Sequence, residues 1–210
     1  MWLRLIVVFI IPFSTMVFLG TWQIFRLKEK IDIITTMQAP STKLLSYDLV
    51  KQSYKSIKVN GAFDNEHLFF VFAGRLGYYV LHPFHLSDGK YILVNKGTVL
   101  DKMSKFEVLN ATQLDIQGIL YCDSYKKIGW FVKNDIDANV WFWFDIKNMM
   151  KQIKIPLESC IIWADNTVAF DGITANVPLK IRNDHLEYIV TWYLLALIWL
   201  IGYICLCCYK

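Results

Sequence analysis

Long uncharged stretches stand near both ends of the chain, and shorter apolar runs with polar breaks fill the region between them. The first stretch covers residues 5–25 and the second covers residues 188–209, and neither contains a charged side chain. At ~1.5 Å rise per residue, a helix of either length crosses the roughly 30 Å hydrocarbon core of a bilayer. The pattern predicts two transmembrane helices in a lipid bilayer, with one domain formed by residues 26–187 between them.

A cleaved signal peptide is the alternative explanation for the first stretch. Its apolar part is longer than the ~7–15 residues of a signal peptide's apolar region, and no small-x-small cleavage site follows it. We therefore expect the first stretch to remain in the protein as a membrane anchor, so that both chain ends face the same side of the membrane.

The middle region carries the alternating or fully apolar short runs that are typical of β-strands. Clusters of Gly, Asn and Asp separate these runs, which are SIKVNGAF, HLFFVFA, GYYVLHPF, KYILVNKGTV, QLDIQGILYC, VWFWFDI and CIIWAD. The short connections AFDNEHL and LSDGKY predict antiparallel hairpins. We expect an α+β membrane protein, in which two transmembrane helices flank one mostly antiparallel barrel or sandwich.

One or two short helices are expected within this domain. Leu44, Leu45 and Leu49 have helical spacing, and Ser41 or Thr42 could cap the helix that they predict. A second helix is predicted in DIKNMMKQI.

Charge and local motifs exclude several classes of function. The net charge is +4, but acids and bases nearly balance in the middle region, so we expect no nucleic-acid partner. The sequence has no dinucleotide or phosphate loop, no HExxH and no GxSxG. His82 and His85 could suggest a metal, but three positions apart on a strand they point to opposite faces. The run from Trp141 to Phe144 favours a core or interface over a stacked ligand.

Orientation in the membrane stays open from the residues alone. Arg4 precedes the first span, whereas Arg26, Lys28 and Lys30 follow it. This pattern places the middle domain in the cytoplasm, but the charge rule weakens when the translocated segment is long. The few residues before the first span leave no room for an organellar presequence, which favours a bacterial membrane.

The cysteines also leave a question open. Cys122 and Cys160 could pair in an oxidising compartment, and their spacing does not decide whether they do. The remaining three, Cys205, Cys207 and Cys208, lie at the end of the second span. They could bind a soft metal or carry a lipid, but small apolar residues at a helix end are the simpler interpretation.

The edges of the two spans carry the candidate chemistry. In the first span, Gly20 permits close approach of another helix and Trp22 suits the interface, while Gln23, Arg26 and Lys30 share a face that could hold an anion or simply anchor the helix.

A histidine stands at the start of the second span. At about 100° per residue, one stripe of this span collects a histidine and five further residues, namely His185, Tyr188, Trp192, Ala196, Trp199 and Tyr203. An imidazole with flanking aromatics suits a flat, apolar, iron-bearing macrocycle, and a plain interfacial histidine is the alternative.

Three segments taken together resemble the surfeit locus protein 1 family of cytochrome c oxidase assembly factors. They are GTWQIFRLKEK, RLGYYVLHPFHLSDGKYILVNKG and NDHLEYIVTWYLLA, and they occur in the family's order along the whole chain. The family's motif residues correspond to Gly20, Trp22, Gln23 and Arg26 in the first span. In the second span they correspond to His185, Leu186, Tyr188, Thr191 and Trp192.

The resemblance implies a protein without enzymatic activity that assists the delivery of heme a to subunit I of cytochrome c oxidase. It implies a bacterial inner membrane, or alternatively a mitochondrial inner membrane, with the middle domain on the outer, periplasmic side. Heme a synthase is a further expected partner. His185 looks like the family histidine implicated in heme contact and is a possible iron ligand. On physical grounds we expect Tyr188 and Trp192 along the macrocycle, because aromatic faces suit a porphyrin, and Arg26 or Arg182 at its propionates, because guanidinium pairs well with carboxylate.

Two departures from the family pattern affect these expectations. Lys96 and Thr98 stand where the family often has Arg and Trp, so a planar fork and an aromatic contact are lost. Asp184 stands where the family often has Asn, next to His185. Two alternatives remain: a structural clamp for oxidase subunits that does not contact heme, and a membrane-anchored enzyme with a site around His82, His85 and Asp88.

Overall fold

A computed structural model describes residues 6–44, 48–64, 66–103, 113–122, 132–165, 172–176 and 178–208 of the protein. The chain divides into two compact units. One unit contains residues 1–35 and 180–210 and is a pair of helices, and the other contains residues 36–179 and is a β domain. The predicted fold class is confirmed, because two apolar helices flank a domain rich in β-strands.

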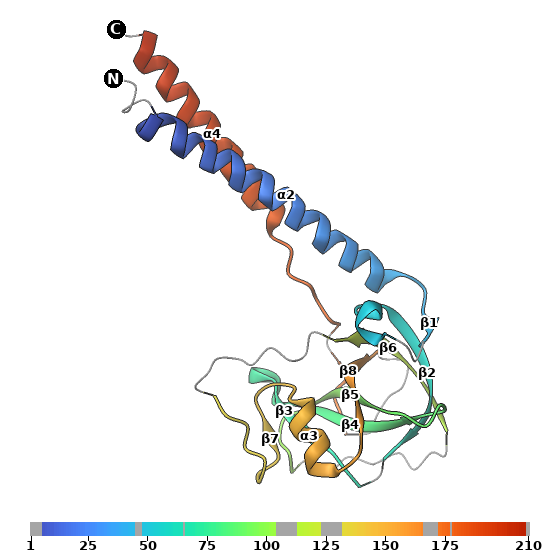
Figure 1. The fold of residues 1–210 in the computed structure, drawn as a ribbon. Coiled ribbons are helices and arrows are strands. Elements are labelled where there is room, and N and C mark those ends of the chain that lie inside the picture. The colour runs from blue at the N-terminus through green and yellow to red at the C-terminus, as the bar shows by residue number, and fades with distance from the viewer. Residues whose placement is uncertain are drawn as a thin grey trace. The chain divides into compact units, whose positions relative to one another are not determined.

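The helix pair consists of α2 and α4, which run antiparallel side by side (Figure 1). A π-helical turn, η1 (Ile6–Ile10), leads into α2 (Ile11–Gln38), and α4 covers His185–Cys208. Only 11% and 6% of the most apolar windows of these helices are buried, so most of their apolar side chains require an apolar solvent. No Gly or Pro follows Phe25 until Pro40, which explains why α2 continues well past the apolar stretch.

In the described part of the β domain, eight strands form one sheet, in the order β1-β2-β6-β8-β5-β4-β3-β7. An additional pairing between β2 and β4 closes a barrel of β2, β6, β8, β5 and β4. Within this barrel β5 and β8 run parallel and the other neighbours run antiparallel. The strand bounds are β1 Thr42–Lys43, β2 Ser56–Phe63, β3 Phe69–Phe72, β4 Tyr78–Leu86, β5 Tyr91–Val99, β6 Leu114–Tyr121, β7 Val140–Trp141 and β8 Leu157–Ala164.

Two hydrophobic cores explain why β5 and β8 are buried along most of their length. The barrel interior holds Phe84, Ile92 and Ile162 among others. The outer face of the same strands packs beneath α3 (Ile146–Ile153) in a second core, whose buried members include Leu93 and Ile161. A strand that is buried on both faces loses the alternation that marks a half-exposed strand.

The predicted helix in DIKNMMKQI is confirmed as α3. Asp145 caps its first turn, since the Asp145 carboxylate accepts a hydrogen bond from the backbone N–H of Asn148 at 3.2 Å. Met149 is fully buried against the sheet, whereas the opposite face of the helix carries Lys147 and Lys151.

Three local predictions were wrong. The first is the helix expected to begin after Ser41 or Thr42. Thr42 and Lys43 instead form strand β1, which pairs in parallel with Ile57 and Lys58 of β2. A short 3-10 helix, η2, covers Leu49–Gln52, and a second, η3, covers Gly74–Leu76. Leu45 lies outside the described residues.

AFDNEHL does not close a hairpin, because β3 pairs with β4 and with β7 rather than with β2. In VWFWFDI only Val140 and Trp141 form a strand. Trp141 is buried in the core, and the chain after it soon reaches Asp145, the N-cap of α3. The hairpin predicted at LSDGKY is confirmed, with β4 and β5 antiparallel on either side of it.

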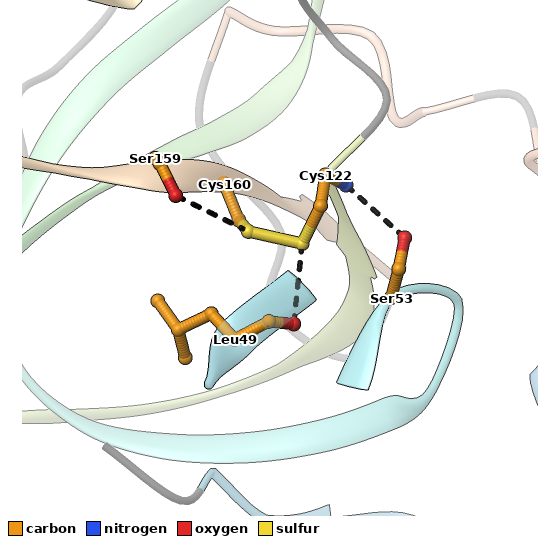
Figure 2. Close-up of a disulfide and its surroundings, with 5 residues drawn as sticks. All are labelled: Leu49, Ser53, Cys122, Ser159 and Cys160. Carbon is orange, nitrogen blue, oxygen red and sulfur yellow. Dashed lines mark hydrogen bonds between the residues drawn. A yellow bond between two sulfur atoms is a disulfide. The ribbon is translucent and has the colours of Figure 1, made fainter. Parts of the chain in front are cut away.

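A disulfide joins Cys122, which directly follows β6, to Cys160 in β8 (Figure 2). Both residues belong to the barrel core, and their Cα atoms lie 4.3 Å apart. The Cys122 sulfur lies 3.4 Å from the Leu49 carbonyl oxygen, and the Cys122 backbone N–H donates to Ser53 Oγ at 3.4 Å. Figure 2 shows both contacts beside the disulfide. The pairing that the sequence left open is therefore present, and it links the end of β6 to β8.

Candidate functional site

The two apolar helices contact each other at several levels along their length. The Phe9 and Tyr203 rings stack with centroids 4.0 Å apart. Nearer the start of α4, the hydroxyls of Thr21 and Tyr193 lie 3.0 Å apart. A Cβ atom on Gly20 would lie only 3.1–3.3 Å from carbon atoms of the Tyr193 ring. The close approach of another helix that was expected at Gly20 is confirmed, and that helix is α4.

The candidate site lies where α4 begins, and we call it the helix-pair site. It is defined by the predicted heme-contacting residues and one neighbour on α2, namely Gln23, Arg26, Arg182, His185, Tyr188 and Trp192. His185 is the first residue of α4, and its Nδ1 atom lies 2.6 Å from Oε1 of Gln23. Gln23 is 9% exposed, so this bond lies at a mostly desolvated position between the helices.

The hydrogen-bonding roles in this contact follow from the chemistry of the amide. An amide oxygen can only accept, so Nδ1–H of His185 donates to Gln23. In a neutral imidazole the other ring nitrogen, Nε2, then keeps its lone pair. A neutral imidazole nitrogen is a common iron ligand, and the bond from Nδ1 to Gln23 fixes the orientation of the ring that carries Nε2.

The aromatic stripe of α4 divides between two environments. Ala196 is buried and Tyr203 stacks on Phe9, so these members of the stripe face α2. Tyr188 is 49% exposed, and Trp192 is partly buried. Near His185 the stripe therefore leaves ring surface for a planar ligand at Tyr188 and Trp192, and Trp199, which is 38% exposed, adds aromatic surface further along α4.

Both arginines of the helix-pair site have an acidic neighbour in their own segment. Arg26 forms an ion pair with Glu29 at 2.5 Å, and Arg182 pairs with Asp184. Arg26 and Arg182 are exposed, and exposed ion pairs contribute only ~0–1 kcal/mol, so a ligand carboxylate could replace either acid. The Asp184 carboxylate, which departs from the family pattern, binds Arg182.

The histidines of the β domain do not form a comparable site. His82 is fully buried, stacks on Phe63 with centroids 4.7 Å apart, and donates from Nε2 to the Asp64 carbonyl. His85 is exposed and packs against Tyr91, so the predicted opposite orientation of the two histidines is confirmed. Burial lowers the pKa of His82 to about 3, and its imidazole is therefore neutral.

Lys96 is a buried cation that the sequence pattern did not mark as buried. Its side chain is 4% exposed, and its Nζ lies 3.8 Å from the centre of the Phe63 ring. Burial lowers the pKa of Lys96 to about 7. Lys96 therefore packs inside the domain instead of offering a surface charge to a partner, and the same holds for the buried Thr98.

The aromatic run after Val140 also packs within the domain. Trp141 is fully buried beside Phe69, and Phe142 contacts Phe72 with ring centroids 5.9 Å apart. Phe144 lies 6.4 Å from Tyr79, again between ring centroids. The prediction of a core role for this run is confirmed at these contacts.

The fold and the helix-pair site together define a membrane protein with two apolar helices and, between them in the sequence, one β-barrel domain. The SURF1 family matches residues 10–197 of the chain. A SURF1-like protein of Rickettsia felis is 32% identical over 94% of this chain and 94% of its own length. The surfeit locus protein 1 of Gallus gallus is 32% identical over 83% of this chain and 66% of its own length. The chain belongs to the SURF1 family.

The contact between Gln23 and His185 was not predicted as a pair. Both residues stood out in the sequence, Gln23 on a possible anion-binding face and His185 on an aromatic stripe. Their sequence separation of 162 leaves no local periodicity that could connect them. The pair could have been predicted from one requirement: a buried amide and an imidazole at the membrane edge both need hydrogen-bond partners.

Proposed function

We propose that this protein is an assembly factor for cytochrome c oxidase that assists the delivery or insertion of heme a into subunit I. Membership of the SURF1 family supports the proposal, and the observation that carries it is the His185 imidazole held by Gln23 with its Nε2 lone pair available. Heme a is the cargo, subunit I is the client, and heme a synthase is the expected donor.

The residues at the helix-pair site fit such a cargo. The Nε2 atom of His185 can bind iron, and the exposed Tyr188 ring with the partly buried Trp192 provides apolar surface beside it. Arg26 and Arg182 can exchange their exposed acid partners for propionates. His185 is the only histidine in the helix unit, so it can supply one ligand from this chain. A single ligand suits a cargo that must be released.

We place the β domain outside the cytoplasm of a bacterial inner membrane, in the periplasm. The Cys122–Cys160 disulfide supports this orientation, because structural disulfides persist in oxidising compartments. The basic residues after the first span, which include Arg26, Lys28 and Lys30, oppose it. The long segment between the spans makes their charge a weak determinant of orientation.

A structural clamp for oxidase subunits is the second candidate. The observation that favours it is the use of Ala196 and Tyr203 in packing against α2, which reduces the surface of α4 open to a ligand. An enzyme site around His82, His85 and Asp88 has less support, since His82 is sealed in the core and His85 lies on the opposite face of its strand.

The test compares His185→Ala with the unaltered protein in cells that make heme a. The heme that co-purifies with the protein and the heme content of the oxidase are both measured. His85→Ala is the matched control, because His85 is an exposed imidazole in the β domain. We expect His185→Ala to lower at least one heme readout while membrane insertion and the control stay normal. Unchanged heme in both places would favour the clamp.

A further inference from the structure

We propose that Gln23 is a positioning residue that holds His185 in the Nδ1–H tautomer and thereby presents Nε2 to the iron of the cargo. The role of the iron rests on the proposed function. The tautomer does not, because it is a property of the helix pair without cargo. Gln23 would thus act through His185 and would not contact the cargo itself.

The contact between Gln23 and His185 is short, joins the two helices and involves a buried amide. The Nδ1 to Oε1 distance is 2.6 Å, and the two residues come from opposite ends of the sequence. Gln23 is the one buried polar residue among the described residues of α2, in a helix whose buried positions otherwise include only Gly20. A polar group that is buried without a hydrogen-bond partner costs free energy, so breaking this bond would destabilise the helix pair.

The packing next to Gln23 fixes how closely the helices approach. Gly20 places the α2 backbone against the Tyr193 ring. The Thr21 hydroxyl donates to the Val17 carbonyl at 2.8 Å, so the Tyr193 hydroxyl is the donor in the 3.0 Å contact with Thr21 Oγ1. This second interhelical bond lies on α2 close to Gln23. It holds the register of the pair independently of His185.

The bond decides which ring nitrogen can bind a metal. With Nδ1 protonated and directed at Gln23, the lone pair belongs to Nε2, on the far side of the ring. If the proton moved to Nε2, the lone pair would lie on Nδ1 and would face Gln23, where no ligand can enter. An acceptor on the first nitrogen also raises the basicity of the second. A neutral amide acceptor does this less than a carboxylate, which suits a site that releases its cargo.

The tautomer can be measured in the cargo-free, full-length protein by ¹⁵N NMR of ring-labelled histidine in detergent micelles. The chain has four histidines, and His185→Ala assigns the signal of interest. At about pH 8, where an ordinary imidazole is neutral, we expect a protonated Nδ1 and an unprotonated Nε2. Gln23→Leu should shift the population towards Nε2–H, whereas Gln23→Glu, which still offers an acceptor, should retain Nδ1–H.

Thr21→Val is the matched control for general loosening of the helix pair. It removes the neighbouring interhelical bond but leaves Gln23 in place, so the His185 tautomer should not change. An Nε2–H tautomer in the unaltered protein would overturn the proposal. The same tautomer in Gln23→Leu as in the unaltered protein would overturn it as well.

Heme measurements separate this inference from the proposed function. In cells that make heme a, we expect Gln23→Leu to reduce co-purified heme several-fold and to shift its absorption bands, while Gln23→Glu retains both. If the unaltered protein binds heme through His185 and Gln23→Leu binds it equally with the same spectrum, the inference fails and the function stands. If no variant binds heme but the tautomer responds as expected, the assigned tautomer stands and the cargo is wrong.

Discussion

Removal of the Cys122–Cys160 disulfide should destabilise the β domain by about 4 kcal/mol. The two cysteines are separated by 38 residues in the sequence. The chain-entropy relation for a closed loop of that length gives a stabilisation of about 4 kcal/mol at 25 °C. Because both cysteines are buried in the barrel core, replacing them with Ala also removes sulfur atoms from a packed interior. The reduced wild-type protein therefore isolates the effect of the bond more cleanly than the double variant does.

The assay is thermal unfolding of the full-length protein in detergent, followed by near-ultraviolet circular dichroism. A loss of about 4 kcal/mol corresponds to a Tm lowered by roughly 8–16 °C for a chain of this size. Oxidised protein, reduced protein and the Cys122→Ala/Cys160→Ala variant are compared. A background in which Cys205, Cys207 and Cys208 are replaced by Ser is the control and should match the wild-type Tm. If reduction lowers the stability by less than about 1 kcal/mol, the bond does not constrain the unfolded chain as argued.

Further outcomes follow for orientation, helix packing and pH. A phosphatase fused within residues 134–139 should be active in the periplasm, and labelling of reduced Cys122 only from the cytoplasmic side would contradict this. Gly20→Leu should reduce cross-linking between cysteines placed at Phe9 and Tyr203, because even a Cβ atom at position 20 would meet the Tyr193 ring. The Tm of the β domain should stay constant, and equal cross-linking yields in both proteins would contradict the packing. Burial lowers the pKa of Lys96 to about 7 in the folded state, from 10.5 in the unfolded chain. Between these two pH values the folded state binds fewer protons than the unfolded state, so the stability of the wild-type protein rises with pH. Lys96→Met should therefore be the more stable protein below pH 7, and its advantage should shrink by up to about 1.4 kcal/mol per pH unit above pH 7; a difference independent of pH would refute the shifted pKa.

Much of the β domain could be predicted from the sequence because its strands have strong local patterns. The run SIKVNGAF forms β2 (Ser56–Phe63) with the expected alternation of burial, and Asp145 begins α3 as a typical cap. The errors lie where tertiary pairing decided the outcome. Thr42 and Lys43 have a helix-like context, but their backbone pairs with β2. The closure of the barrel through β2 and β4 depends on contacts between distant strands, which no local pattern contains.

The helix-pair site could be predicted residue by residue but not as an arrangement. Small size marked Gly20 as a crossing point, and the cost of an imidazole at a membrane edge marked His185. The bond between Gln23 and His185 required the antiparallel register of two helices from opposite ends of the chain. Lys96 was difficult for another reason, since its burial over Phe63 opposes the usual preference of lysine for the surface.

The most direct test of the central proposal is the visible absorption spectrum of the full-length protein purified from cells that make heme a. The matched preparation comes from cells without heme a synthase. We expect bound heme with the absorption bands of heme a in the first preparation, their absence in the second, and a reduced signal in His185→Ala. Protein free of heme in all three preparations, although it still associates with oxidase subunits, would contradict heme delivery and leave the structural clamp as the better account.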